Sequence, residues 1–309
     1  MRQALLWLSH QQSIFRFVRS NPLAKHFASR FVAGETLDTA VAAVKELNAR
    51  RITASLDLLG ESVTKPEEAL AARDEYLRML DRIAADGVNA NVSVKLTQMG
   101  QDISEAALRE NAFAILARAK QHNTFVRFDM EGTPYTDRTL DFFTNECVPQ
   151  YGAHCGVVIQ SMLRRSPGDI DRLIGMKARV RLCKGAYLES AEHAFPAKRD
   201  VDAQYVALMK QLMTEGNYPG LATHDERIIA EAKTFATANR IAPDRFEFQM
   251  LYGVRRDLQE KLRAEGWNVR VYIPFGTQWY PYLMRRLAER PANIAFIMGN
   301  VVREAVGGR

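Results

Sequence analysis

The most regular feature of the sequence is an alternation between short apolar segments and longer segments of helical periodicity. From residue 53 onward, eight short segments are rich in apolar and β-branched side chains, which is typical of buried strands. They are residues 53–59, 91–96, 125–131, 156–160, 179–185, 221–225, 246–251 and 269–276. The stretches between them place apolar residues three and four positions apart, as in Ala106–Gln121 and Ile228–Asn239. The pattern therefore predicts a succession of strand–helix units.

Eight such units have the rhythm of an α/β (β/α)8 TIM barrel, in which parallel strands alternate with helices. A doubly wound sheet is the alternative, but it usually has fewer strands and often opens with a glycine-rich turn. No GxGxxG motif occurs in the sequence. We therefore predict one barrel domain over residues 51–309, which includes the C-terminal helices.

Residues 1–50 differ from the rest because they show helical spacing and no strand pattern. Apolar residues recur at three- and four-residue steps between Leu5 and Val18, and again between Leu37 and Leu47. No cluster of acids, bases or metal ligands occurs there. The pattern predicts an N-terminal helical arm that serves packing or contact with a partner.

The stretch from residue 269 to residue 293 joins the last predicted strand to a helix. The strand breaks at a Pro-Phe-Gly turn, and helix formers follow. On that helix Tyr282, Arg285, Arg286 and Glu289 fall on one face. Two adjacent guanidiniums suit an anion held between them, because arginine grips carboxylate or phosphate with two parallel hydrogen bonds. A solvated helix face is the alternative explanation.

Composition and charge narrow the class of protein. The 309 residues are 47% hydrophobic and 25% charged, which is typical of a soluble globular protein. The net charge of +6 favours anionic substrates or a peripheral contact with a membrane surface. Lysines and arginines are scattered rather than massed, which argues against nucleic-acid binding. No run of 18 apolar residues occurs, so no membrane-spanning segment is predicted.

The three cysteines, Cys147, Cys155 and Cys183, show no CxxC spacing. Their odd number argues against a disulfide framework, and a reducing cytoplasmic compartment fits best. HExxH, GxSxG and Asp/His ladders are also missing. The sequence therefore predicts no metal centre and no serine nucleophile.

Polar residues stand at or near the ends of seven of the eight predicted strands, where the working residues of a (β/α)8 barrel lie. Each alone has an ordinary structural explanation, such as an internal ion pair or a loop hydrogen bond. Together they form a set with more cations than acids, which suits a large anionic cofactor and a carboxylate substrate. The set is Lys95, Asp129, Met130, Glu131, Gln160, Arg181, Lys184, Gly185, Ala186, Tyr187, Thr223, His224, Asp225, Glu247, Gln249 and Tyr272.

The motifs that contain these residues resemble those of the proline dehydrogenase family, the flavin-dependent first enzymes of proline catabolism. The most specific is YLMRRLAE at 282–289, with Asn293 downstream. The others are VSVKL around Lys95, RFDMEG around Asp129, RLCKGAY at 181–187, ATHD at 222–225, EFQML at 247–251 and YIPFG at 272–276. They occur in family order, and no aldehyde dehydrogenase domain follows. The resemblance is therefore to a monofunctional bacterial member.

The resemblance implies a distorted barrel that holds non-covalent FAD above its C-terminal mouth, with L-proline lying against the flavin. It assigns Asp129 as a catalytic or site-organising acid and Arg181 as a catalytic residue that tunes the flavin. The residues implied for substrate binding are Lys95, Arg285 and Arg286 on the carboxylate and Tyr272 and Tyr282 beside the ring. Those implied for FAD are Met130, Gln160, Arg181, Lys184, Gly185, Ala186, Thr223 and His224.

In the implied reaction a hydride leaves the carbon beside the ring nitrogen for flavin N5, and a quinone reoxidises the flavin. The product is pyrroline-5-carboxylate. The amine must be neutral to release hydride, and the sequence does not identify the base that achieves this. Electron transfer to a quinone fits a basic cytoplasmic protein that visits the inner membrane surface, and oligomerisation stays open.

Two positions depart from the family pattern: Leu188 stands where bacterial relatives often have Trp, and Val201 where a threonine is common. They put individual FAD contacts in doubt. Tyr272, closing over the ring, would favour proline over hydroxyproline. Two other functions remain open: a Schiff-base lyase with Lys95 or Lys184 as the amine, and an anion- or nucleic-acid-binding module.

Overall fold

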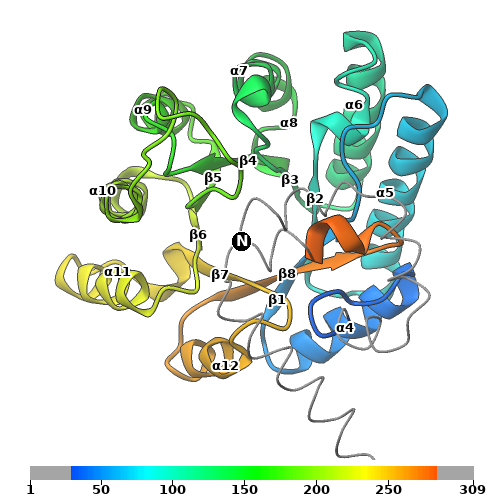
Figure 1. Ribbon diagram of the computed structural model, residues 1–309. Coiled ribbons are helices and arrows are strands. Elements are labelled where there is room, and N and C mark those ends of the chain that lie inside the picture. The colour runs from blue at the N-terminus through cyan, green and yellow to red at the C-terminus, as the bar shows by residue number, and fades with distance from the viewer. Residues whose placement is uncertain (1–28, 284–309) are drawn as a thin grey trace, which may run out of the picture.

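The structure, a computed structural model, describes residues 29–283. Its eight strands pair in parallel in chain order and close into a barrel through pairing of the first strand with the last (Figure 1). The predicted (β/α)8 fold is therefore confirmed. The strands are β1 (Thr53–Leu58), β2 (Ala90–Val94), β3 (Val126–Phe128), β4 (Cys155–Gln160), β5 (Arg179–Cys183), β6 (Gly220–Ala222), β7 (Glu247–Leu251) and β8 (Val269–Phe275).

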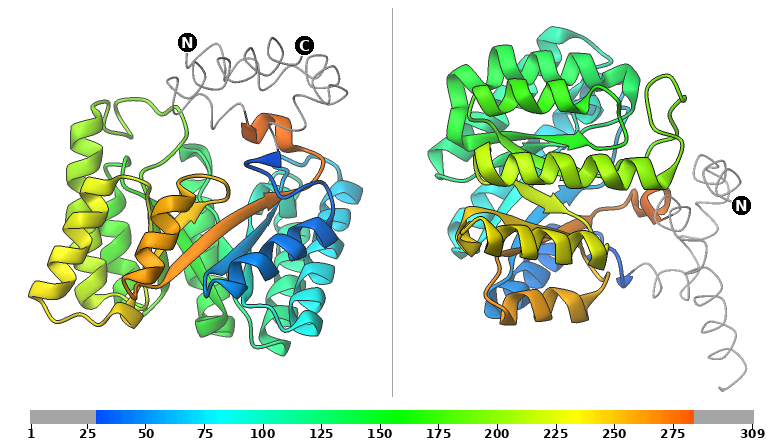
Figure 2. Two further views of the ribbon diagram at one scale, coloured as in Figure 1. Left: turned by 90° about the horizontal axis from the view of Figure 1, so that it is seen from below. Right: turned by 90° about the vertical axis from the view of Figure 1, so that its left-hand side faces the viewer.

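Helices surround the strands on the outside of the barrel, as the two side views also show (Figure 2). They are α4 (Leu37–Ala49), α5 (Pro66–Asp86), α6 (Glu105–Gln121), α7 (Thr133–Phe142), α8 (Val148–Tyr151), α9 (Ser166–Gly175), α10 (Lys198–Glu215), α11 (Glu226–Ala238) and α12 (Arg256–Ala264). A 3-10 turn, η1 (Leu96–Met99), follows β2, and a π-helical turn, η2 (Phe143–Cys147), follows α7. None of the helices in the described range has the length and apolar composition that crossing a bilayer requires.

Local signals set the ends of several helices. Pro66 occupies the first turn of α5, where its missing N–H costs nothing, and Gly87 ends that helix in the left-handed conformation. The Ser104 side chain accepts a hydrogen bond from the backbone N–H of Ala107 and so caps α6. The helix predicted over Ala106–Gln121 therefore begins one residue earlier than its apolar spacing indicated.

The first described helix, α4, packs against β1 and β8 and buries Ala40, Val44 and Leu47 in the main apolar core. Part of the predicted N-terminal arm thus contributes to the layer of helices around the barrel. Residues 1–28 lie outside the described range, and the division of the chain at residue 50 stays a prediction.

Successive residues of the strands alternate between the helices and the barrel interior. On β5, for example, Val180 and Leu182 join the apolar core, whereas Arg181 extends to partners on other strands. On β3, the fully buried Arg127 donates to the backbone carbonyl of Val157 on β4. The barrel interior is therefore polar, and its charged groups lie directly below the C-terminal mouth.

Candidate active site

A cavity of about 450 Å³ lies at the C-terminal ends of the strands. It brings together most of the residues predicted for the site, although they come from all parts of the chain. Those that line it are Lys95, Asp129, Met130, Arg181, Lys184, Gly185, Ala186, Thr223, His224, Tyr272 and Tyr282. A site on parallel strands gathers such residues because all the carboxyl ends meet at one face of the barrel.

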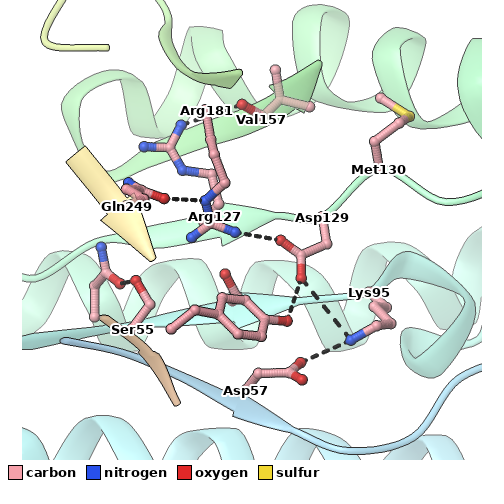
Figure 3. Close-up of polar contacts among 12 residues, drawn as sticks. Ser55, Asp57, Lys95, Arg127, Asp129, Met130, Val157, Arg181 and Gln249 are labelled. Atoms are coloured by element: carbon pink, nitrogen blue, oxygen red, sulfur yellow. Dashed lines mark hydrogen bonds and ion pairs between the residues drawn. The ribbon is translucent and has the colours of Figure 1, made fainter. Parts of the chain in front are cut away.

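Asp129 lies at the centre of the cavity floor, just beyond β3 (Figure 3). Arg181 Nη1 donates to its Oδ1 at 2.8 Å, and the hydroxyl of Tyr272 donates to its Oδ2 at 2.7 Å. Both oxygens of the carboxylate are thus occupied by donors from β5 and β8. Charge-assisted hydrogen bonds of this length fix the orientation of the carboxylate and of the phenol.

Lys95 follows β2 and pairs with Asp57 near the end of β1, at 2.8 Å between Nζ and Oδ1. It lies 4.0 Å from Oδ2 of Asp129. Burial alone would lower the pKa of Lys95, but the charges of Asp57 and Asp129 outweigh it and raise the pKa well above its ordinary value. The ammonium is therefore retained inside the barrel.

Asp57 is a functional candidate that the sequence analysis missed. Its side chain is 1% exposed and lines the cavity. Burial raises its pKa, the nearby charge of Asp129 adds to this, and the opposing effect of Lys95 is smaller. The only sequence signal is a single acidic residue inside the apolar segment TASLDLL, which is also typical of a structural ion pair.

Arg181 is held from below by residues of β7 and β8. Its Nε donates to Gln249 Oε1, and Gln249 Nε2 donates at 2.6 Å to Glu247. Glu247 also accepts from Arg270 Nε at 2.7 Å. Burial would raise the pKa of Glu247, and Arg270 outweighs it, so the pKa is lowered. This chain of buried hydrogen bonds orients the Arg181 guanidinium at the cavity floor.

A second lysine, Lys184, stands on the far wall beyond β5. Its Nζ lies 2.6 Å from Oδ1 of Asp202 on α10 and 2.8 Å from Oδ2 of Asp225. Burial would raise the pKa of both carboxyls, but their hydrogen bonds with Lys184 outweigh it and lower both values. Lys198 on α10 also pairs with Asp202. The carboxylates of Asp202 and Asp225 on this wall are therefore ionised at neutral pH.

Thr223 and His224 follow β6 and hold the adjacent loops in place. The Thr223 hydroxyl accepts from the backbone N–H of Asp225 at 3.0 Å. His224 Nε2 accepts at 2.9 Å from the backbone N–H of Leu251. The imidazole therefore carries no proton on Nε2 in this arrangement.

Gln160 is the one described member of the predicted cofactor set that does not line the cavity. It is buried, and its Nε2 donates to the carbonyls of Met130 and Glu131 at 3.1 and 3.0 Å. It holds the loop after β3 in position. The predicted pair Arg285 and Arg286 lies outside the described residues.

The two departures from the family pattern have different surroundings. Leu188 is 56% exposed on the loop after β5. Val201 packs against the small apolar cluster that contains Met162 and Leu163.

Within residues 29–283, no group of three or more acidic, histidine or cysteine side chains is placed to hold a metal ion.

Comparisons with known proteins identify the same family that the sequence motifs resemble. The proline dehydrogenase family profile matches residues 40–298. The chain is 42% identical to a proline dehydrogenase of Deinococcus radiodurans, over 98% of each chain. It is 40% identical to proline dehydrogenase 1 of Bacillus subtilis, over 98% of this chain and 100% of that one.

Among solved structures, a match is proline utilization A (PutA) from Bdellovibrio bacteriovorus inactivated by N-propargylglycine, with a TM-score of 0.81 and 26% identity. The match covers 90% of this chain and 34% of that one, so this chain spans about a third of that protein's length.

Proposed function

The chain belongs to the proline dehydrogenase family, and on that premise we propose that it oxidises L-proline to pyrroline-5-carboxylate with bound FAD as the hydride acceptor. The observation that supports this most directly is the cavity floor, where two carboxylates and two cations lie together. These groups are Asp57, Lys95, Asp129 and Arg181. A small zwitterion needs both signs of charge within reach, and the cavity volume of about 450 Å³ suits a small molecule.

The residues that we assign to FAD fit a large anionic ligand. Within the described chain, Nη2 of Arg181 has no hydrogen-bond partner, so the guanidinium has a donor left for a molecule in the cavity. The Lys184 ammonium lines the same cavity. FAD, when bound, supplies the N5 atom that accepts the hydride, and nearby cations favour the negative charge that reduction adds. The proposed FAD set is Met130, Gln160, Arg181, Lys184, Gly185, Ala186, Thr223 and His224.

We assign substrate binding to a second set of groups in the same cavity. Lys95 uses one N–H on Asp57, and an ammonium has three, so it retains donors for a carboxylate. Tyr272 is oriented by Asp129, and Tyr282, which is 6% exposed, lines the same cavity. Arg285 and Arg286 complete the proposed carboxylate clamp. Holding the reacting carbon in line supplies much of the rate in such a reaction.

The same geometry argues against a Schiff-base lyase at Lys95. A nucleophilic amine must be neutral, and such lysines have lowered pKa values. Asp57 and Asp129 instead outweigh the effect of burial and raise the pKa of Lys95 well above its ordinary value. The amine is therefore protonated and a poor nucleophile.

We further propose that electrons pass from FAD to a quinone, in a cytoplasmic protein that contacts the inner membrane peripherally. The net charge of +6 supports such a contact, since anionic lipid surfaces attract basic proteins. L-Proline and the quinone are then the small-molecule partners.

The absorption spectrum of the purified protein before and after anaerobic addition of L-proline tests the cofactor and the substrate together. We expect a flavin spectrum that proline bleaches. A colourless protein that borohydride traps covalently with its substrate would instead support the lyase. Salt-sensitive binding of anions with no turnover would support a binding module.

A further inference from the structure

The two carboxylates of the cavity floor are held in different ways. Asp129 accepts from Arg181 on one oxygen and from Tyr272 on the other, and its side chain is 14% exposed. Asp57 is 1% exposed, and among the cations of residues 29–283 only Lys95 pairs with it, through Oδ1. Both oxygens of Asp129 thus already accept from strong donors, whereas Asp57 combines deep burial with access to the cavity.

The proposed reaction requires a proton acceptor in this cavity. The nitrogen of L-proline is a secondary ammonium at neutral pH, and it has no lone pair with which to form a C=N bond. The cations Lys95 and Arg181 cannot accept its proton. Tyr272 is a protonated phenol, since burial raises its pKa well above the ordinary value. Of the floor groups, only the carboxylates remain as candidate acceptors.

We propose that Asp57 accepts the proton of the substrate ammonium and is the general base of this site. The inference rests on the proposed function. The N–H bond of the ammonium breaks, and the proton forms an O–H bond on the carboxylate of Asp57. The freed lone pair forms the C=N bond while the neighbouring ring C–H bond breaks, and its electron pair leaves as hydride to FAD. The substrate loses two electrons and the flavin gains them.

The surroundings of Asp57 make protonation easy. The titratable and charged groups that face it are Lys95 after β2, Asp129 after β3, Tyr272 on β8 and Tyr76 on α5. Burial raises the pKa of Asp57, and Asp129 adds a like charge, while Lys95 opposes both. When Asp57 is protonated, Asp129 remains between Lys95, with Nζ 4.0 Å from its Oδ2, and Arg181, with Nη1 2.8 Å from its Oδ1. Lys95 therefore keeps a carboxylate nearby, and the carboxylate of the bound substrate supplies the second negative charge that the two cations need.

The test is the pH dependence of flavin bleaching by proline in the holoenzyme, measured by stopped flow for wild type, Asp57→Asn and Asp57→Glu. In wild type, kcat/KM should rise with pH and level off once the Asp57 carboxyl is ionised. In Asp57→Asn only the neutral amine can react, so kcat/KM should rise tenfold per pH unit up to the pKa of the ammonium. At neutral pH the deficit should be at least about 100-fold. Asp57→Glu should restore the plateau at a lower rate.

Asp202→Asn is the matched control, because it removes a carboxylate that pairs with the other cavity lysine and does not itself line the cavity. Its pH profile should keep the wild-type shape. An Asp57→Asn profile of wild-type shape and height would overturn the inference. If wild type itself is not bleached by proline, the proposed function fails instead.

A second measurement does not depend on turnover. Proline is added to chemically reduced holoenzyme, which cannot accept hydride, and an infrared difference spectrum is recorded. We expect a new carbonyl stretch of a protonated carboxyl group in wild type and in Asp57→Glu. Absence of the band in wild type, at a proline concentration shown to bind, would overturn the inference even if Asp57→Asn does not fold.

Discussion

Two lysines at the barrel mouth each lie between two aspartates, yet the two clusters differ in how readily a carboxylate within them accepts a proton. The Lys95 cluster is Lys95 with Asp57 and Asp129, and the Lys184 cluster is Lys184 with Asp202 and Asp225. In the first, the side chains of Lys95 and Asp57 are 10% and 1% exposed. In the second, the three side chains are 24–26% exposed.

Depth accounts for the difference. Burial raises the pKa of Asp57 despite its hydrogen bond with Lys95, whereas hydrogen bonds with Lys184 outweigh burial and lower the pKa of Asp202 and Asp225. The same residue types therefore give a carboxyl with a raised pKa in the buried floor and carboxyls with lowered pKa values in the more exposed wall. The floor suits the substrate, whose amine changes charge, and the wall suits an anionic cofactor.

The largest effect should follow Lys95→Met, which removes the cation of the buried cluster. We expect kcat/KM for proline to fall at least about 100-fold, equivalent to about 2.7 kcal/mol, because a carboxylate contact and the partner of Asp57 are both lost. The free energy of unfolding should fall by about 3–5 kcal/mol at neutral pH, since an unpaired charge stays buried. Steady-state kinetics and urea unfolding measure the two effects.

The pH dependence sharpens that prediction. In the variant, the unpaired Asp57 has a raised pKa in the folded state, so the folded protein binds a proton that the unfolded chain releases. Its stability is therefore highest in acid and falls as the pH rises through that pKa. If the variant lost the same free energy of unfolding relative to wild type at pH 4 and at pH 7, the raised pKa of the unpaired Asp57 would be contradicted.

Lys184→Met tests the wall and should have a smaller, different effect. We expect the affinity for FAD to weaken by about tenfold, or about 1.4 kcal/mol, because one charge on an anionic ligand is lost. The stability of the apoprotein should change by less than about 1 kcal/mol, since a partly exposed ion cluster contributes little. Flavin titration by fluorescence measures the affinity. A loss of kcat with unchanged FAD affinity would show that the two lysines do not divide their roles in this way.

The apolar segments of the sequence located every strand of the barrel, because a buried parallel strand consists of a short run of apolar residues. The predicted ends of the strands were less accurate. The third segment continued to Glu131, whereas β3 ends at Phe128. The backbone N–H of Asp129 still donates to the Val94 carbonyl of β2 at 2.9 Å, but the carbonyls of Met130 and Glu131 accept from the Gln160 side chain instead of from a neighbouring strand. Apolar spacing carries no information about such contacts.

For the site, the residue types at the strand ends predicted most of the cavity lining but not how its members pair. Lys95 was assigned to the substrate carboxylate, and its ion pair with Asp57 depends on β1 and β2 lying in register, with Asp57 opposite Ser93. That register cannot be read from either segment alone. The roles of the lining residues, and of Arg285 and Arg286 outside the described range, stay predictions.

The smallest predicted effect separates the two clusters by the sign of their pH dependence. Asp202 has a lowered pKa in the folded state, so its ionised form stabilises the protein above the ordinary value of 3.8, and this contribution is lost as the pH falls through the lowered value. Asp202→Asn should therefore lose less than about 1 kcal/mol near neutral pH and match wild type in strong acid.

The control is Asp200→Asn, which removes a negative charge from the first turn of the same helix, α10, where Asp200 pairs with the exposed Arg199. It accounts for any general effect of charge at that helix end. Urea unfolding between pH 3 and pH 7 measures all three proteins. A deficit for Asp202→Asn that grows toward acid pH would mean that the wall, like the floor, favours the protonated carboxyl, and the contrast between the clusters would not hold.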